Sequence, residues 1–265
     1  MLFLPARIVF MIVNEEKKKY KVLMLDIDGT LIKLEHNAKP SIRVLEAIKQ
    51  AQQKLHVGIV TGRPLFFLQD FFNLVKLESP CIINGGAQII DPLTKSVLWE
   101  QCIDKKDLRS IADMLPKQLE NTVIVDTANN EYPFSSYLEI NKPLKAVIID
   151  ITIEEANIIS KQLNRISNLA IHKASSQIKG KLNIDITHVN ATKQYGIEKV
   201  SEILNIRTHD FIAVGDHYND FPLLMACGLK IAMGNAVEDL KAIADYIAPS
   251  VEEDGVVDVI EKYVL

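Results

Sequence analysis

The stretch VLMLDIDGTL, residues 22–31, decides the fold that this sequence predicts. Its apolar run, Val22 to Leu25, leads directly into two aspartates, Asp26 and Asp28, with no turn signal in between. A parallel strand that is buried on both faces reads as such a run, and ligands of open α/β sheets gather beyond the carboxyl ends of the strands. The stretch therefore predicts a buried parallel strand with two carboxylates at the edge where ligands bind.

Two carboxylates this close together need a cationic partner. Two unit charges about 4 Å apart interact by roughly 4 kcal/mol at an effective dielectric of 20, so a divalent ion is a favourable companion. Gly29 permits a turn after them, and Thr30 supplies a hydroxyl. The pattern is typical of a phosphoryl-transfer site, although the hexapeptide alone also fits a strand that ends in an acidic turn.

The composition is that of an ordinary globular chain. Of the 265 residues, 48% are hydrophobic and 24% are charged, which suits one large or two modest domains. With 30 Lys and Arg against 34 Asp and Glu, the net charge of -4 gives no electrostatic reason to expect nucleic acid as a partner. The three widely spaced cysteines show neither metal-ligand spacing nor a disulfide framework, which indicates reduced thiols in a cytoplasmic protein.

Residues 1–20 are interpreted as an extension that precedes the fold. Residues 1–13 are mostly apolar, but they lack a basic start and a small-residue cleavage site, and they are too short to span a bilayer. A start at Met11 would give a short polar lead into the first strand. We therefore expect residues 1–10 to be a disordered tail or a start-site artefact, and we expect no membrane partner.

Polar residues also follow two further apolar runs. Residues 55–60 form the second run, which ends in the turn TGRP at 61–64. Proline favours the first turn of a helix, so the backbone N–H groups of this turn lie at a helix start, where an anion can dock. Residues 81–83 form a third short strand, which is closed by Asn84.

The pattern changes beyond this third strand. A hairpin over 88–101, a helix over 105–119, a loop that contains residues 132–134, and further strands with one more helix interrupt the β/α alternation. We interpret residues 85–189 as a second domain, inserted between the core segments 21–84 and 190–265.

The alternation of strands and helices resumes after the insertion. Lys193 opens a helix, and the apolar strand 211–214 follows it. This strand runs into a polar turn that contains Asp216, Asn219 and Asp220. With the runs that end before Asp26 and Thr61, this makes three strand ends that carry side chains suited to phosphoryl transfer.

These four motifs, in this order, resemble the haloacid dehalogenase superfamily. The place of the insertion resembles the Cof-type sugar-phosphatase branch of its subfamily IIB, and the resemblance runs from about Lys21 to Val257. It implies an α/β fold: a Rossmann-like core with a parallel sheet, and an inserted α/β cap domain of the C2 type.

The resemblance also implies roles for the residues at the strand ends. Asp26 would be the nucleophile that forms an aspartyl-phosphate, and Asp28 would be the general acid and base. Lys193 would offset the negative charge of Asp26 and of the phosphate. The residues implied to bind the substrate or its phosphate are Thr61, Gly62, Arg63, Asn84 and Lys193. Those implied to bind Mg²⁺ or orient its ligands are Asp26, Asp28 through its carbonyl, Asp216, Asn219 and Asp220.

Several of these residues have an ordinary structural explanation when taken alone. Thr61 can cap a helix, Lys193 can be a solvated surface lysine, and Asp220 can sit in a first helical turn where the dipole favours it. The complete set in this order favours the catalytic interpretation.

The predicted function is Mg²⁺-dependent hydrolysis of small phosphorylated metabolites, sugar phosphates above all, by a monomer or homodimer. A cap of about 100 residues would close a cavity of the right size for them, and Tyr132 and Phe134 are candidates for contacting the leaving group. Two alternatives remain open at this point. One is a phosphomutase that uses the same intermediate, and the other is a catalytically inactive sensor of a phosphorylated ligand.

Overall fold

The computed structural model describes residues 20–34, 38–176 and 178–265. The predicted extension therefore lies, except for Tyr20, outside the described residues. Within these three ranges, no helix is both long enough and apolar enough to cross a membrane.

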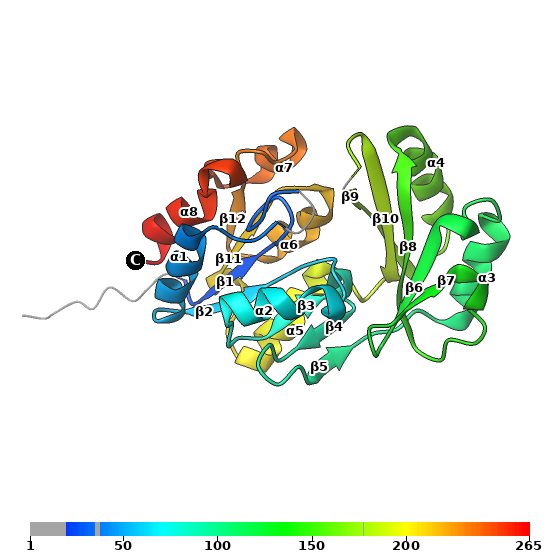
Figure 1. Ribbon diagram of the computed structural model, residues 1–265, viewed down its shortest axis with the longest axis horizontal. Helices are drawn as coiled ribbons and strands as arrows, with labels where there is room; N and C mark the ends of the chain where they lie inside the picture. Colours follow the sequence, from blue (N-terminus) through cyan, green and yellow to red (C-terminus); the bar gives the residue numbers. More distant parts are fainter. Residues whose placement is uncertain (1–19, 35–37, 177) are drawn as a thin grey trace, which may run out of the picture.

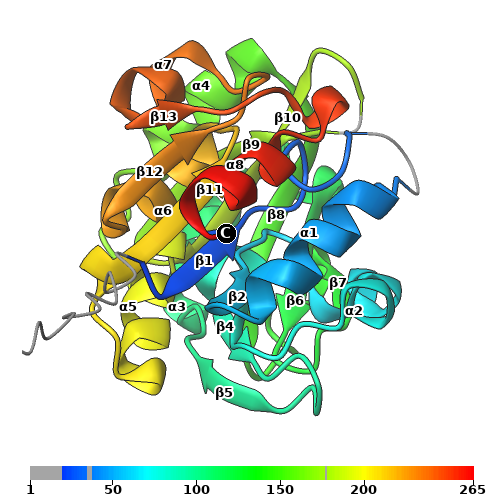
Figure 2. The same ribbon diagram turned by 90° about the vertical axis from the view of Figure 1, so that its left-hand side faces the viewer.

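Five parallel strands form the sheet of the core, in the order β13-β12-β11-β1-β2. β1 lies between β11 and β2 (Figure 2), so the segments that follow these three strands meet at one edge of the sheet. The predicted parallel sheet is confirmed. Its strands are β1 (Val22–Leu25), β2 (His56–Ile59), β11 (Phe211–Gly215), β12 (Leu229–Ala232) and β13 (Tyr246–Ile247).

Helices cover both faces of the core sheet. Alternate residues of a strand point to opposite faces, so Leu23 and Leu25 pack against α1, α2 and α8, whereas Val22 and Met24 pack against α5, α6 and α7. α1 begins after Ser41, whose hydroxyl accepts a hydrogen bond from the backbone N–H of Val44. The core helices are α1 (Ile42–Gln52), α2 (Gln69–Val75), α5 (Lys193–Leu204), α6 (Phe221–Ala226), α7 (Glu238–Ile243) and α8 (Gly255–Tyr263).

The predicted hairpin after the third strand packs on the core. β3 (Cys81–Ile83), β4 (Gln88–Ile90) and β5 (Val97–Glu100) form an antiparallel sheet of three strands. Ile82 of β3 makes a parallel bridge to Val60, just beyond β2. Hydrophobic contacts group the hairpin with the core rather than with the insertion, and we therefore propose that the cap begins near residue 103 and not at 85.

The inserted segment forms a second sheet with its own hydrophobic cluster. Its strand order is β7-β6-β8-β10-β9, and the pairing is antiparallel throughout. Ile148 and Ile184 point to one face, where α3 and α4 cover them. The elements are α3 (Lys105–Met114), β6 (Thr122–Asp126), β7 (Glu131–Pro133), β8 (Pro143–Thr152), α4 (Ile153–Leu163), β9 (Leu169–Ser175) and β10 (Lys181–His188).

The cap departs from the sequence prediction in two places. The helix expected over 105–119 ends at Met114, because the residue before a proline disfavours helical geometry and Pro116 follows Leu115. The segment at 131–133, expected to be a loop, pairs as β7 with β6.

The uncovered face of the cap sheet turns toward the core. Figure 1 shows the cap beside the core, with α3 and α4 on the side away from it. β9 contacts the turn 218–220 that follows β11, and β10 contacts the turn 84–86 that follows β3. The cap therefore lies over the edge of the core sheet that carries the predicted site.

Candidate active site

A buried cation joins two aspartates at the carboxyl ends of β1 and β11. The Nζ of Lys193, the first residue of α5, lies 2.6 Å from Asp26 Oδ1 and 2.5 Å from Asp220 Oδ1. All three side chains are almost completely buried. The structure therefore excludes a solvated surface position for Lys193 and places its Nζ beside Asp26, the first residue after β1.

Asp220 also holds the turn after β11 in place. Its second oxygen, Oδ2, accepts hydrogen bonds from the backbone N–H groups of Asp216 and His217, at 2.9 and 3.0 Å. With Lys193 on Oδ1, both oxygens of Asp220 are engaged. Asn219 lies half-buried in the same turn, and its side chain makes no hydrogen bond to any residue that the structure describes.

The carboxylates of this cluster are buried and repel one another, and both effects raise the pKa values of two of them. Burial and the negative charge of Asp220 raise the pKa of Asp26 to about 8 despite Lys193. Burial and the charges of Asp220 and Asp26 also raise the pKa of Asp216 well above its usual range. Burial alone would lower the pKa of Lys193, but Asp220 and Asp26 raise it above the ordinary value. The cluster thus has a surplus of negative charge that one lysine does not neutralise.

This surplus fits an oxygen-preferring divalent cation. One carboxylate oxygen from each of Asp26, Asp216 and Asp220 lies within 4.8 Å of the others, and all three residues are buried. Hard cations such as Mg²⁺ bind carboxylate oxygens, and a bound cation reverses the effect of burial on acidic groups. Because Asp220 already accepts three hydrogen bonds, Asp26 and Asp216 are the better ligands.

The loop after β1 approaches Asp216 closely at Gly29. A Cβ atom at this position would overlap the Asp216 carboxylate, and Gly29 has a φ of +85°, so glycine is required on both counts. Asn235, in the turn after β12, donates from Nδ2 to the carbonyl of Gly29 at 2.8 Å. Asn235 was not among the predicted residues, although it follows a core strand at the same edge of the sheet.

The turn after β2 carries the predicted phosphate-binding residues. Thr61 is buried, and its hydroxyl accepts a hydrogen bond from the backbone N–H of Arg63 at 3.1 Å. The Arg63 guanidinium makes two hydrogen bonds to Asp28, of 2.8 Å from Nε and 2.5 Å from Nη2. The structure thus pairs Arg63 with the predicted acid and base, a contact between residues 35 apart that the sequence did not indicate.

Asn84 and Gly86 connect β3 to the start of α5, where Lys193 lies, and to the cap. The backbone N–H of Asn84 donates to the Arg63 carbonyl at 3.0 Å, and its side chain donates to Asn129 of the cap at 2.8 Å. A Cβ atom at Gly86 would overlap the backbone of Thr192, so glycine allows the close approach that places the start of α5 beside β3.

Charged residues of the cap were missed in the sequence analysis. Lys145 of β8 and Asp185 of β10 are both buried, and the Lys145 Nζ lies 3.5 Å from Asp185 Oδ1. Lys145 also donates to the carbonyl of Gly62 at 2.7 Å. A charged side chain within an apolar strand was the available signal, because such groups are rarely buried unless they are paired.

The structure places both aromatic residues proposed for the leaving group at the hydrophobic cluster of the cap. Phe134 is fully buried in the hydrophobic cluster of the cap, so its proposed contact with the leaving group is wrong. Tyr132 packs against the same cluster, and its hydroxyl lies 3.2 Å from Asp126 Oδ2.

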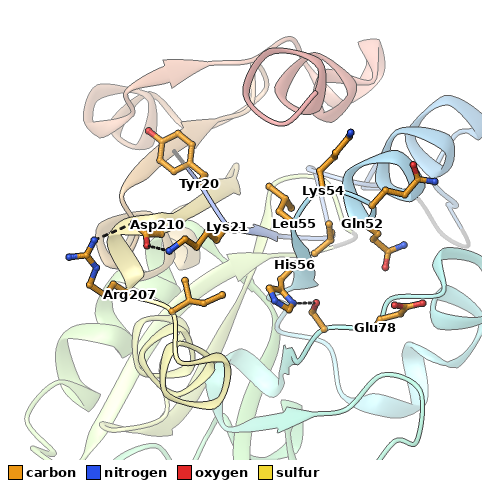
Figure 3. Close-up of a pocket in the computed structure, with 13 residues that line it drawn as sticks. Tyr20, Lys21, Gln52, Lys54, Leu55, His56, Glu78, Arg207 and Asp210 are labelled. Atoms are coloured by element: carbon orange, nitrogen blue, oxygen red, sulfur yellow. Dashed lines mark hydrogen bonds and ion pairs between the residues drawn. The ribbon is translucent and has the colours of Figure 1, made fainter. Parts of the chain in front are cut away.

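A cavity of about 1070 Å³ opens at the opposite, amino ends of the core strands. Its wall includes Lys21 and His56 at the starts of β1 and β2, with Arg207 and Asp210 before β11 (Figure 3). Asp210 pairs with Lys21 at 3.1 Å and with Arg207 at 3.8 Å. None of the residues predicted for catalysis lines this cavity.

Comparison with known proteins now identifies the family. The family model for haloacid dehalogenase-like hydrolases matches residues 23–136 and 125–260. The chain belongs to this family of hydrolases. The resemblance predicted from the motifs is thereby confirmed, and so is the prediction of a phosphatase as the class of enzyme.

Relatives of this hydrolase match it over nearly its whole length. It is 28% identical to 5-amino-6-(5-phospho-D-ribitylamino)uracil phosphatase of Bacillus subtilis, over 96% of this chain and 100% of that protein. It is 24% identical to phosphoglycolate phosphatase 1 of Saccharolobus solfataricus, over 91% and 95%. A solved sugar phosphatase of subclass IIB of the superfamily is 25% identical, with a TM-score of 0.75 over 91% of this chain and 98% of that one.

Proposed function

We propose that this hydrolase is a Mg²⁺-dependent phosphatase of small phosphorylated metabolites, sugar phosphates among them, that acts through an aspartyl-phosphate. The observation that carries the proposal is the buried contact of Lys193 with Asp26 beside Asp216. A carboxylate held among like charges is a strong candidate for a functional group. The curated relatives support phosphate-ester hydrolysis as the reaction, because they are named as phosphatases of several small molecules.

The residues divide the reaction between them. Asp26 attacks phosphorus, the bond from phosphorus to the leaving oxygen breaks, and Asp28 gives that oxygen a proton. Water then attacks the aspartyl-phosphate, Asp28 takes a proton from it, and inorganic phosphate and free Asp26 are released. Lys193 stabilises negative charge at Asp26 and at the phosphoryl oxygens throughout. Thr61 and the backbone N–H groups after β2 would orient the phosphate.

The acidic cluster is suited to hold Mg²⁺ beside the reacting phosphate. Asp26 and Asp216 would bind the ion through their carboxylates and Asp28 through its backbone carbonyl, while Asn219 and Asp220 would orient its remaining ligands. When bound, the ion supplies positive charge where negative charge develops. The free thiols of Cys81, Cys102 and Cys227 suit a reducing compartment, so we place the enzyme in the cytoplasm.

A metabolite screen with and without metal tests this proposal. Purified protein should release inorganic phosphate from several small phosphate monoesters in Mg²⁺, should lose this activity in EDTA, and should regain it when Mg²⁺ is restored. Ca²⁺ should restore little activity, because it prefers more ligands and longer bonds than the octahedral geometry of Mg²⁺. The proposal fails if no ester is hydrolysed in Mg²⁺, or if exhaustively chelated protein retains its full rate.

A further inference from the structure

We propose that the leaving group of the substrate is held by a polar patch in which the Asn84 side-chain carbonyl and the Thr187 hydroxyl lie beside the Lys145–Asp185 pair. We further propose that this leaving-group patch selects uncharged, hydroxyl-bearing leaving groups over carboxylates. The inference rests on the proposed phosphatase function and specifies its substrate class. It is carried by two observations, one from the core and one from the cap.

The first observation is a chain of side-chain amides whose orientation is determined at both ends. The backbone N–H of Leu65 donates to Asn129 Oδ1 at 2.9 Å, and the backbone carbonyl of Thr127 accepts from Gln88 Nε2 at 3.0 Å. Between them, Asn129 Nδ2 donates to Gln88 Oε1 at 2.8 Å. Amide orientation is assigned from such networks, and backbone groups have only one polarity. The Asn84 atom that lies 2.8 Å from Asn129 Oδ1 must therefore be the nitrogen.

The consequence is that Asn84 presents an acceptor. Its Oδ1 atom is completely buried and has no hydrogen-bond partner among the described residues. Phosphate oxygens are acceptors too, so this carbonyl does not bind them. Asn84 was predicted to bind the phosphate, and we assign its side chain instead to a hydrogen-bond donor on the leaving group.

The second observation is the polar face of the cap sheet. Asp185 and Thr187 are two residues apart on β10 and so share a face, and Lys145 of β8 pairs directly with Thr187. A Cβ atom on Gly62 would lie 3.0 Å from Asp185 Oδ2, and one on Gly85 would lie 3.8 Å from the Thr187 methyl group. This face therefore touches the turns after β2 and β3, the second of which carries Asn84. The Thr187 hydroxyl is completely buried there without a partner among the described residues.

The chemistry of the patch favours a hydroxyl as its ligand. Asn84 Oδ1 and the ionised Asp185 carboxylate can only accept hydrogen bonds, whereas the Thr187 hydroxyl can both donate and accept. The Lys145 ammonium already donates two of its three hydrogens, to Gly62 and Asp185. A hydroxyl donates and accepts at once, so it can satisfy both kinds of group. A carboxylate only accepts, so it would leave Asn84 unpaired and would face the Asp185 charge, which Lys145 offsets only in part.

Three phosphate esters with one carbon skeleton test the selectivity. Propyl phosphate has no further polar group, glycerol 3-phosphate adds two hydroxyls, and 3-phosphoglycerate replaces the terminal hydroxyl-bearing carbon by a carboxylate. The wild-type enzyme in Mg²⁺ should show a kcat/KM for glycerol 3-phosphate at least tenfold above that for each of the others. Equal values, or a preference for 3-phosphoglycerate, would overturn the inference while leaving the phosphatase function intact.

Thr187→Val is the decisive variant, because it removes the hydroxyl with little change of shape. The ratio of kcat/KM for glycerol 3-phosphate to that for propyl phosphate should fall about tenfold, as expected for one lost hydrogen bond. The melting temperature should not fall, since the buried hydroxyl has no partner within the described chain. Thr122→Val is the matched control: Thr122 is also buried in the cap, but its hydroxyl donates to the Gln118 carbonyl, away from the patch.

A second variant keeps the test open if Thr187→Val does not fold. Asn84→Gly removes the acceptor and keeps the positive φ of +54° without strain, and the same ratio should fall. An unchanged ratio in the folded variants, or an equal fall in Thr122→Val, would refute the patch. If the wild-type enzyme hydrolyses no ester at all, the proposed function fails and the inference fails with it.

Discussion

The two ends of the core sheet are built from the same strands but differ in their charged residues: a buried acidic cluster lies at one end and exposed cations at the other. At the carboxyl ends, Asp26, Asp216 and Asp220 are at most 5% exposed and crowd around one lysine. At the amino ends, Lys21 and Arg207 have side chains 57% and 83% exposed, and both pair with Asp210. The amino ends also border a cavity of about 1070 Å³.

This difference shows that the candidate site is identified by its buried charged groups and not by the volume of a cavity. The two cations at the amino ends are solvated, and they neutralise the buried carboxylate of Asp210, so little free energy is lost by placing these charges together. Charges at the carboxyl ends are desolvated and only partly neutralised, a costly arrangement that persists in proteins mainly where it serves a function. Substitutions should therefore have large effects on activity at one end of the sheet and small effects at the other.

The largest effect is expected for Asp26→Asn. The amide is nearly the same size as the carboxylate but is a poor nucleophile, so kcat should fall by several orders of magnitude, as for other members of covalent catalytic units. Steady-state phosphate release in saturating Mg²⁺ measures it, with circular dichroism as the control for folding. A well-folded variant that keeps a tenth of the wild-type rate would show that Asp26 is not the nucleophile.

A smaller loss is expected at Arg63. Arg63→Met removes both hydrogen bonds to Asp28, whereas Arg63→Lys keeps the charge but loses the two-pronged geometry. We expect kcat to fall about a hundredfold in Arg63→Met and about tenfold in Arg63→Lys, because Asp28 loses the partner that orients it. Rates for one fast substrate in all three proteins measure this. Equal rates in the wild type and Arg63→Met would mean that the pair is dispensable.

The strand ends could be predicted because their signals are local. The apolar runs of β1 and β11 lead directly into Asp26 and Asp216, and parallel strands bring such ends to one edge whatever the rest of the chain does. Lys193 could be placed only through the resemblance to a family. Its own surroundings give no sign that a lysine at a helix start should be buried.

Other parts could not be predicted because they depend on distant partners. The Asn129 side chain contacts segments 41 to 64 residues away, so no local pattern reveals its role. The hairpin β4–β5 was assigned to the insertion because it follows the change of pattern, yet Ile89 packs with Met24 of the core. α8 did have a local signal, in the helical spacing of Val256, Val259 and Ile260, which the sequence analysis overlooked.

In the metal-free protein, the burial and mutual repulsion of the carboxylates at the carboxyl end should make the free energy of unfolding depend on pH. The folded pKa of Asp26, about 8, exceeds its ordinary value of 3.8, so between these values the folded state holds a proton that the unfolded state has lost. The free energy of unfolding must therefore fall as pH rises through this window. The amide that Asp26→Asn introduces does not titrate in this range. In EDTA, the free energy of unfolding of Asp26→Asn minus that of the wild type should therefore increase from pH 5 to pH 8.5.

Denaturant unfolding at the two pH values measures this difference. Mg²⁺ should reduce the difference at pH 8.5, because a bound cation stabilises the ionised carboxylates of the wild-type protein. A difference in the free energy of unfolding that does not change with pH would show that the pKa of Asp26 is not raised in the folded protein.

The smallest effect is expected at the amino end of β2, and a pair of substitutions, one at each end of this strand, compares the two ends of the sheet directly. His56 begins β2 on the wall of the cavity, and its Nδ1 lies 3.2 Å from the Ser79 hydroxyl. Thr61 follows the other end of the same strand and is buried in the turn that we propose to bind the phosphate. His56→Ala should keep kcat/KM within about twofold, since it removes one partly exposed hydrogen bond, whereas Thr61→Ala should lower it at least tenfold. Each variant removes a few side-chain atoms at one end of β2, and a loss of stability in either would appear as a fall in its melting temperature. If His56→Ala lost as much activity as Thr61→Ala at an unchanged melting temperature, the amino end would be coupled to catalysis, and the division between the two ends of the sheet would be wrong.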